Sequence, residues 1–332
     1  MAITPVTLSD VLVIGAGPAG LSAALTLARA LQKVVVFDSG VYRNARATHM
    51  HTLPTWDHAS PAEFRAAARK EILSRYDTVK FQDTLLTKIA GPILDPAGAS
   101  RYFEAAADDG QVWRGRSVIL ATGARDVTPD LIGYDDCWVK GIFHCLFCHG
   151  YEERGAESAA VLAIPPVSDV GPVLHLARGA KQLASKVTIY TDGNHDLAAS
   201  LSAALRVDEA GDSAILDTRS IARLEKIQPA DSVTDVMIHF SDGSAPRREG
   251  FLVHRPKVEI NGPFAQQLGL QLTPQGDIFT NQPFGETSLP GVFAAGDCGS
   301  GGKIVSNALY TGACCGAGVT AKLQARYDAV SK

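Results

Sequence analysis

The chain has 332 residues, of which 46% are hydrophobic and 20% charged, and its formal net charge is −4. The length allows two domains with separate cores, and the composition is that of an ordinary globular protein. The net charge and the lack of a Lys/Arg block argue against a nucleic-acid partner. No apolar run approaches the roughly 18 residues of a membrane span, and residues 1–10 lack the basic start of a signal peptide. We therefore expect a cytoplasmic protein with no membrane partner.

A dinucleotide-binding turn is predicted at the start of the chain. Residues 11–14 are expected to form a buried strand, and residues 15–20 have the sequence GAGPAG. An apolar helix with Pro18 at its start follows and runs through Leu21, Leu25, Leu27 and Leu31. A second strand at 34–37 ends in Asp38. This G-x-G-x-x-G pattern in a strand–turn–helix context, with an acid after the second strand, is typical of nucleotide-binding domains.

Each glycine of this turn has a physical task. Gly15 allows the tight turn, Gly17 lets the backbone approach a pyrophosphate, and Gly20 lets the helix pack on the strand. The helix N-terminus offers N–H groups and a positive dipole end to the phosphates, and Asp38 can accept hydrogen bonds from ribose hydroxyls. The predicted contacts are Gly15, Gly17, Pro18, Ala19, Gly20 and Asp38.

Two further segments precede the middle of the chain. Ser60-Pro61-Ala62-Glu63 is a capping box and predicts a helix at about 61–76. Residues 117–120 predict a strand that ends in the small-residue turn Ala121-Thr122-Gly123.

Cys145 and Cys148 form a C-x-x-C motif, and His149 follows directly. Two sulfurs at this spacing can close a disulfide, which accepts two electrons as a unit. Six cysteines in 332 residues are too sparse for a disulfide scaffold, and in a reducing compartment a C-x-x-C pair is redox-active or metal-binding. The other four cysteines are expected to be structural: Cys137, Cys298, Cys314 and Cys315.

A second nucleotide-binding turn is expected after a strand at 159–164, but its motif is missing. The sequence at 165–171 is PPVSDVG, in which two prolines remove N–H donors and Asp169 adds repulsion toward phosphate. The next strand, at 186–190, ends in TDGNHD, whose two carboxylates oppose a 2′-phosphate. The sequence therefore predicts a dinucleotide-type domain that does not bind NADPH tightly.

The end of the chain completes a flavin-binding pattern. Residues 291–297, GVFAAGD, predict a strand and turn, and a Gly-rich stretch leads to a helix from about Val305. With the Ala121-Thr122-Gly123 turn, these segments resemble the A-T-G and G-x-(F/Y)-A-x-G-D segments of flavoproteins with two dinucleotide domains. The resemblance implies FAD as cofactor, with Asp297 on its ribityl chain and the N-terminus of the last helix facing the flavin ring.

This layout implies an α/β fold with two dinucleotide-binding, Rossmann-like domains of the thioredoxin reductase type, the second without an intact NADPH motif. Residues 1–123 and 251–332 would form a discontinuous FAD-binding domain. Residues 124–250 would form an inserted domain that carries the C-x-x-C pair.

The segments DSGVYRN at 38–44, HMH at 49–51 and HCLFCHGYEER at 144–154 resemble thioredoxin-reductase-like flavoproteins, specifically the dithiol oxidases that make epidithiodiketopiperazine disulfides (the gliotoxin oxidase type). Ordinary thioredoxin reductases place Asp after the second cysteine, where this chain has His149. The resemblance implies a homodimeric FAD enzyme of secondary-metabolite biosynthesis that oxidises a small-molecule dithiol, with O₂ as acceptor and H₂O₂ as product. The further cofactor contacts that it implies are Ser39, Arg43, Asn44, His51, Ala121, Thr122, Gly123, Gly296, Asp297, Ile304 and Val305.

In such an enzyme a substrate thiolate attacks the oxidised cysteine pair, and the second substrate thiol closes the product ring. By analogy, Cys145 is the exposed interchange sulfur and Cys148 the sulfur that passes electrons to the flavin. Thiol pKa values of about 8.5 call for a base at neutral pH, and histidine titrates near 6.5. The candidates are His144, His149 and His254, and the sequence does not choose among them.

Other functions fit parts of the pattern. The main alternative is an NADPH-dependent, thioredoxin-reductase-like disulfide reductase. C-x-x-C-H is also the c-type haem attachment motif, which would make the chain an electron-transfer protein. The cysteine pair alone also fits a non-catalytic dithiol-binding protein, or a zinc site that would need further ligands.

Overall fold

The computed structural model places the chain in two compact units. The described residues are 7–95, 101–207, 214–227 and 234–330. The first unit comprises Met1–Arg125 and Glu259–Lys332, and the second comprises Asp126–Val258. The boundaries predicted from the sequence are after residues 123 and 250. Where the chain passes between the units, strand β7 (Ala124–Val127) pairs with strand β16 (Lys257–Ile260).

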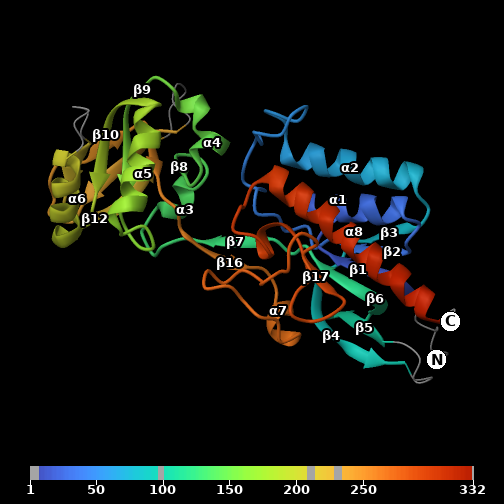
Figure 1. Ribbon diagram of the computed structural model, residues 1–332. Helices are drawn as coiled ribbons and strands as arrows, with labels where there is room; N and C mark the ends of the chain where they lie inside the picture. The colour runs from blue at the N-terminus through green and yellow to red at the C-terminus, as the bar shows by residue number, and fades with distance from the viewer. Residues whose placement is uncertain (1–6, 96–100, 208–213, 228–233, 331–332) are drawn as a thin grey trace. The chain divides into compact units, whose positions relative to one another are not determined.

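The first unit is built on a seven-stranded sheet (Figure 1). Its strands are β1 (Leu8–Ile14), β2 (Val34–Phe37), β3 (Val79–Gln82), β4 (Leu86–Leu94), β5 (Arg101–Ala107), β6 (Val112–Leu120) and β17 (Val292–Ala294). The order is β3-β2-β1-β6-β5-β4, and β17 pairs with β6. β1 and β2 contain the predicted strands at 11–14 and 34–37, which are buried as parallel strands covered on both faces usually are.

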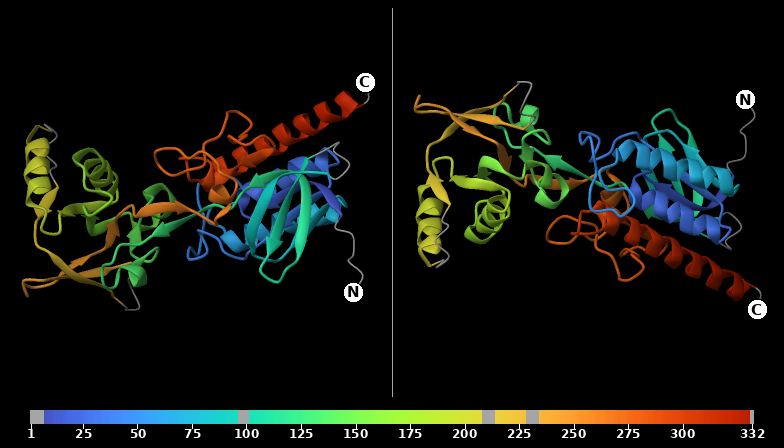
Figure 2. Two further views of the ribbon diagram at one scale, coloured as in Figure 1. Left: turned by 90° about the horizontal axis from the view of Figure 1, so that it is seen from below. Right: turned by 90° about the horizontal axis from the view of Figure 1, so that it is seen from above.

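Different layers cover the two faces of this sheet. On one face lie α1 (Pro18–Arg29), α2 (Pro61–Arg75) and α8 (Val305–Val330), and α1 and α8 run side by side (Figure 2). On the other face, Phe37 and Phe103 form a core with Phe264 of the short helix α7 (Phe264–Gln267).

The predicted starts of α2 and α8, at Pro61 and about Val305, agree with the structure. The capping prediction for α2 is confirmed, because Ser60 Oγ accepts a hydrogen bond from the N–H of Ala62. Helix α1, which was predicted to run through Leu31, ends earlier, at Arg29. Leu31 lies beyond it in a left-handed conformation, with φ of 58°, and its side chain is 80% exposed.

The second unit has its own parallel sheet of five strands. Its strands are β11 (Ile215–Asp217), β10 (Ala184–Tyr190), β9 (Ala156–Leu162), β15 (Phe251–Val253) and β8 (Ile142–Phe143), in that order across the sheet. Helix α5 (Val170–Lys181) and helix α6 (His195–Val207) pack on one face. A three-stranded antiparallel sheet of β12 (Ile221–Lys226), β13 (Val236–Phe240) and β14 (Arg247–Glu249) shares a core with the other face. Short helices complete the unit: α3 (Tyr134–Cys137), α4 (Leu146–His149) and the 3₁₀ turn η1 (Tyr151–Glu153). The two units confirm the predicted α/β class with two dinucleotide-type folds.

Candidate active site

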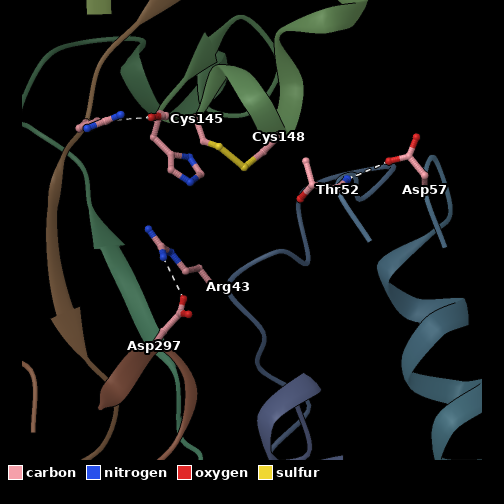
Figure 3. The surroundings of a disulfide bond; sticks show 8 residues. Arg43, Thr52, Asp57, Cys145, Cys148 and Asp297 are labelled. Carbon is pink, nitrogen blue, oxygen red and sulfur yellow. Dashed lines mark hydrogen bonds and ion pairs between the residues drawn. A yellow bond between two sulfur atoms is a disulfide. The ribbon is translucent and has the colours of Figure 1, made fainter. Parts of the chain in front are cut away.

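Cys145 and Cys148 form a disulfide at the start of α4, with their Cα atoms 5.2 Å apart (Figure 3). Cys145 is the N-cap residue of this short helix. Its carbonyl oxygen accepts hydrogen bonds from the N–H groups of Cys148 and His149, both at 3.1 Å. The first helical turn therefore brings the two sulfurs within bonding reach. The disulfide predicted from the C-x-x-C spacing is present.

The residues between the two cysteines point in different directions. Leu146 packs against the core that α5 forms with the sheet of the second unit, and so fixes α4 to a rigid element. Phe147 is 80% exposed. This exposed aromatic ring, one residue before Cys148 in the sequence, is available for contact with an apolar molecule.

His144 and His149 flank the disulfide and have different ring contacts. The His144 ring lies 5.6 Å from the Trp138 ring and 6.5 Å from the His149 ring, measured between centroids. The His149 ring stacks on Phe143 at 5.9 Å. Both histidines are half-buried, so both stay candidates for the base.

His254 lies in the core of the second unit. It has no exposed surface, its Nδ1 lies 2.7 Å from the Tyr134 hydroxyl, and its Nε2 lies 3.3 Å from the carbonyl oxygen of Ile164. Burial lowers the pKa of His254 to about 4. A substrate thiol does not reach such a nitrogen, so the geometry argues against His254 as the base and for a structural role.

In the first unit, three of the predicted cofactor segments meet at one edge of the sheet. β1, β6 and β17 are parallel neighbours that pair up to their last residues. Their carboxyl ends therefore carry the turns at 15–20, 121–123 and 296–297 to the same edge. Ligands of open α/β sheets bind at this edge.

The three glycines of the turn at 15–20 differ in the space around them. Gly15 has φ of 110°, and a Cβ there would lie 2.2 Å from the carbonyl oxygen of Ala121. A Cβ at Gly20 would lie 1.8 Å from the carbonyl oxygen of Gly15. At Gly17, by contrast, no described atom lies within 4 Å of a Cβ. The turn is packed tightly against its own sheet and open at the position that approaches a pyrophosphate.

The N-terminus of α1 is suited to an anion. Gly17 is its N-cap, no side chain caps it, and Pro18 and Ala19 begin a first turn without an acidic residue. The first N–H groups of a helix have no partner within the helix and carry the positive end of its dipole. The residues present therefore fit the diphosphate of FAD.

Arg43 and Asp297, both predicted to contact the flavin cofactor, form an ion pair within the first unit (Figure 3). Arg43 Nη1 lies 2.9 Å from Asp297 Oδ2. The neighbouring N–H of Gly296 donates to Thr311 Oγ1 of α8, at 2.9 Å. Lys303 Nζ donates to the carbonyl oxygen of Asp297, also at 2.9 Å. Two contacts therefore hold Asp297 itself, and a third holds the residue before it.

Asp38 has partners that the sequence did not indicate. The Tyr42 hydroxyl lies 2.6 Å from both carboxylate oxygens of Asp38, and Arg69 Nη1 lies 3.8 Å from one of them. Burial raises the pKa of Tyr42. The Arg65 guanidinium lies 3.7 Å from the centre of the Tyr42 ring and donates to Asn44 Oδ1. The sequence does contain one signal for these contacts: Arg65 and Arg69 are four residues apart, which places both side chains on one face of α2.

His51 belongs to a loop in which Met50 and Ala59 pair as an isolated bridge. His51 Nε2 lies 3.0 Å from His58 Nδ1. The carboxylate of Asp57 accepts from the N–H of Thr52 at 2.8 Å (Figure 3). The loop is therefore held closed by its own contacts.

The remaining predicted cofactor residues also lie in the first unit. Ser39 Oγ accepts from the N–H of Val41 at 3.3 Å. The carbonyl oxygens of Thr122 and Gly123 accept from the side chain and backbone of Asn261. Ile304 is 46% exposed, and Val305 is the first residue of α8. All predicted cofactor residues thus belong to the first unit, and all predicted catalytic residues to the second.

The turn after β9 differs from the glycine turn of the first unit. Side chains occupy it, and those of Ala163, Ile164 and Val167 are buried. Pro165 and Pro166 supply no N–H group. Within the part of the second unit that the structure describes, Arg219 follows β11, and its guanidinium is already paired with Asp217. These described features differ from the open turn at Gly17, where the first N–H groups of α1 are available to a phosphate.

Among the described residues, no helix is long and apolar enough to cross a membrane.

The family model for pyridine nucleotide-disulphide oxidoreductases matches residues 9–163. Thioredoxin reductase aclD of Aspergillus oryzae is 48% identical over 95% of this chain and 96% of its own length. Thioredoxin reductase sirT of Leptosphaeria maculans is 42% identical over 93% of both chains.

The solved structure of HlmI is similar, with a TM-score of 0.82 and 26% identity over 97% of this chain and 95% of that one. These likenesses confirm the resemblance to thioredoxin-reductase-like flavoproteins and the prediction of FAD. A relative 48% identical along almost the whole length shows that this chain belongs to the thioredoxin-reductase-like pyridine nucleotide-disulphide oxidoreductases, which bind FAD and act on dithiols and disulfides.

Proposed function

We propose that this protein oxidises a small-molecule dithiol to an intramolecular disulfide, and that O₂ is the final acceptor and becomes H₂O₂. The observation that carries the proposal is the turn after β9. Its prolines and buried side chains stand where an NADPH-dependent enzyme needs open backbone N–H groups. Without NADPH as donor, electrons have to enter from the substrate.

The Cys145–Cys148 disulfide is the oxidant of the substrate. A substrate thiolate attacks one sulfur, forms a mixed disulfide and releases the other sulfur as a thiolate. The second substrate thiol then attacks the mixed disulfide, which closes the product ring and leaves two reduced cysteines. The substrate loses two electrons and two protons. Over the full cycle O₂ takes up these two electrons and two protons and becomes H₂O₂.

His144 or His149 would accept the proton of the attacking thiol, because both border the disulfide and neither is fully buried. By analogy with the family, Cys145 is the sulfur that the substrate attacks and Cys148 the one that faces the flavin. When bound, FAD supplies two-electron redox chemistry between a dithiol and oxygen.

The cofactor would be held by residues of the first unit. The N–H groups at the start of α1 would bind its diphosphate, Asp38 a ribose, and Asp297 the ribityl chain. On the family resemblance, we further propose a homodimer in the cytoplasm whose substrate is a secondary metabolite of the epidithiodiketopiperazine class.

A second function has support from the names of the relatives, which are called thioredoxin reductases. An NADPH-dependent reductase would pass electrons in the opposite direction, from flavin to the cysteine pair. Anaerobic mixing separates the two functions. The oxidase proposal expects dithiothreitol to bleach the flavin band and NADPH to leave it unchanged over the same time. Rapid bleaching by NADPH would favour the reductase.

A further inference from the structure

His254 contacts two parts of the second unit: its side chain reaches the turn after β9, and its backbone reaches the strand that leads to the disulfide. Its Nε2 faces the carbonyl oxygen of Ile164, which can only accept a hydrogen bond, so Nε2 carries the proton. Its Nδ1 is then the acceptor for the Tyr134 hydroxyl. The contacts thus select one neutral tautomer, which agrees with complete burial.

The carbonyl that His254 holds belongs to the turn after β9. Ile164 and Pro165 stand where a dinucleotide-binding domain has its glycine turn. The N–H of Val167 donates to the Ile164 carbonyl at 2.8 Å, so the same oxygen also closes the turn locally. The side chain of His254 therefore fixes this turn from within the core.

The backbone around His254 holds the residues that precede the disulfide. Val253 pairs with Phe143 in the sheet, and the N–H of His254 donates to the Phe143 carbonyl at 3.1 Å. Arg255 Nε donates to the carbonyl oxygen of His144 at 3.2 Å. Three consecutive residues thus fix the segment that leads directly into Cys145.

A second connection between His254 and His144 runs through packed aromatic rings. Tyr134, the partner of His254, stacks with Trp138, with ring centroids 5.7 Å apart and planes 21° apart. Trp138 in turn lies against the ring of His144 at 5.6 Å. A change at the His254 side chain therefore reaches His144 through packed rings as well as through the strand.

We propose that His254 is a positioning residue for the redox pair: its imidazole ties the turn at Ile164–Pro165 and Tyr134 to the segment that orients His144 and Cys145. The turn that in related folds would hold a nucleotide serves here as a support for the disulfide. The inference rests on the redox role of the cysteine pair in the proposed function, but not on the electron acceptor.

The test is the rate at which excess dithiothreitol reduces the disulfide of the purified protein, followed by thiol labelling over about pH 5 to 8. His254→Gln keeps an N–H donor near Nε2 and loses the acceptor at Nδ1. Tyr134→Phe removes the hydroxyl that contacts His254 and keeps the aromatic ring. It therefore tests the same contact if His254→Gln does not fold. His175→Gln changes an exposed histidine of α5 and is the control.

We expect both core variants to slow disulfide reduction roughly tenfold at every pH, because the attacked sulfur is no longer held in line, while the shape of the pH profile stays unchanged. Wild-type rates in both folded variants would overturn the proposal and leave His254 a purely structural residue. Loss of a wild-type inflection in His254→Gln would also overturn it, in favour of His254 as base. The assay needs neither oxygen nor NADPH, so its result is independent of whether the oxidase function fails.

Discussion

Arg43 and Asp297 lie 254 positions apart in the chain, yet the guanidinium of the first donates to the carboxylate of the second at 2.9 Å. The contact joins the two sequence segments from which the first unit is built. Both side chains are more than four-fifths buried, with exposed fractions of 16% and 18%. This charged pair therefore connects the N-terminal and C-terminal segments of the flavin-binding unit, at the sheet edge where its cofactor segments meet.

Arg43→Met is expected to destabilise the protein by about 2 kcal/mol, because it leaves the Asp297 carboxylate without its cation in a mostly buried place. The matched control is Arg125→Met, since Arg125 pairs with Glu259 at 2.8 Å but is 67% exposed. An exposed pair of this kind contributes at most about 1 kcal/mol. Urea unfolding measures the loss in free energy of unfolding for each variant. Equal losses would contradict the claim that the buried Arg43–Asp297 pair stabilises the fold more than the exposed pair.

Gly17→Ala and Gly20→Ala separate cofactor binding from folding. At Gly17 a methyl group meets no described atom within 4 Å, so we expect unchanged stability without FAD but much weaker FAD binding. At Gly20 the methyl would lie 1.8 Å from the Gly15 carbonyl oxygen, so we expect loss of stability itself. Thermal unfolding of the FAD-free protein and titration with FAD measure the two effects. Full FAD affinity in a folded Gly17→Ala variant would show that the pyrophosphate lies elsewhere.

The roles of the two cysteines are tested by trapping. In Cys148→Ser the thiol of Cys145 remains, and we expect it to form a stable mixed disulfide with an oxidised small dithiol, visible by mass spectrometry. In Cys145→Ser we expect little such adduct. Cys314→Ser, a half-buried free cysteine of α8, should behave as wild type. Adduct formation mainly at Cys148 would reverse the assignment.

The stability of the fold should fall in mild acid because of His254. Its pKa is about 4 in the folded protein, against about 6.5 for an ordinary histidine, because burial favours the neutral form. Well above pH 6.5 both states are neutral and the contribution is complete. As the pH falls from 6.5 through 4, the unfolded state binds a proton first, and on the order of 3 kcal/mol of stability is lost.

Urea unfolding at pH 7 and at pH 4.5 measures this loss. In His254→Gln the difference between the two pH values should shrink. The same pH dependence in wild type and variant would assign the acid sensitivity to other groups.

The parts of the fold with local sequence signals were predictable. The strand and turn at 11–20, the capped start of α2 at Ser60 and the start of α8 at Val305 follow from glycine, proline and apolar spacing, and the structure has all three. The C-x-x-C disulfide belongs to the same group, since its residues lie in one helical turn. These signals act over a few residues and need no knowledge of the rest of the chain.

What the sequence did not provide depends on contacts between distant residues. His254 was a candidate base because histidine titrates near neutral pH, but it is fully buried and paired with Tyr134, 120 positions away. The pairing of Asp38 with Tyr42 depends on how the chain turns after β2. Burial and partner choice decide the role of such side chains, and neither has a local pattern.

The most direct test of the central claim measures hydrogen peroxide under air. The purified FAD-bound protein receives either a small dithiol or NADPH, and oxygen consumption is followed together with H₂O₂. We predict one H₂O₂ for each dithiol oxidised, no comparable oxygen consumption with NADPH, and no turnover with dithiol in Cys148→Ser. Rapid NADPH consumption coupled to disulfide reduction, with no H₂O₂ from the dithiol, would contradict the account.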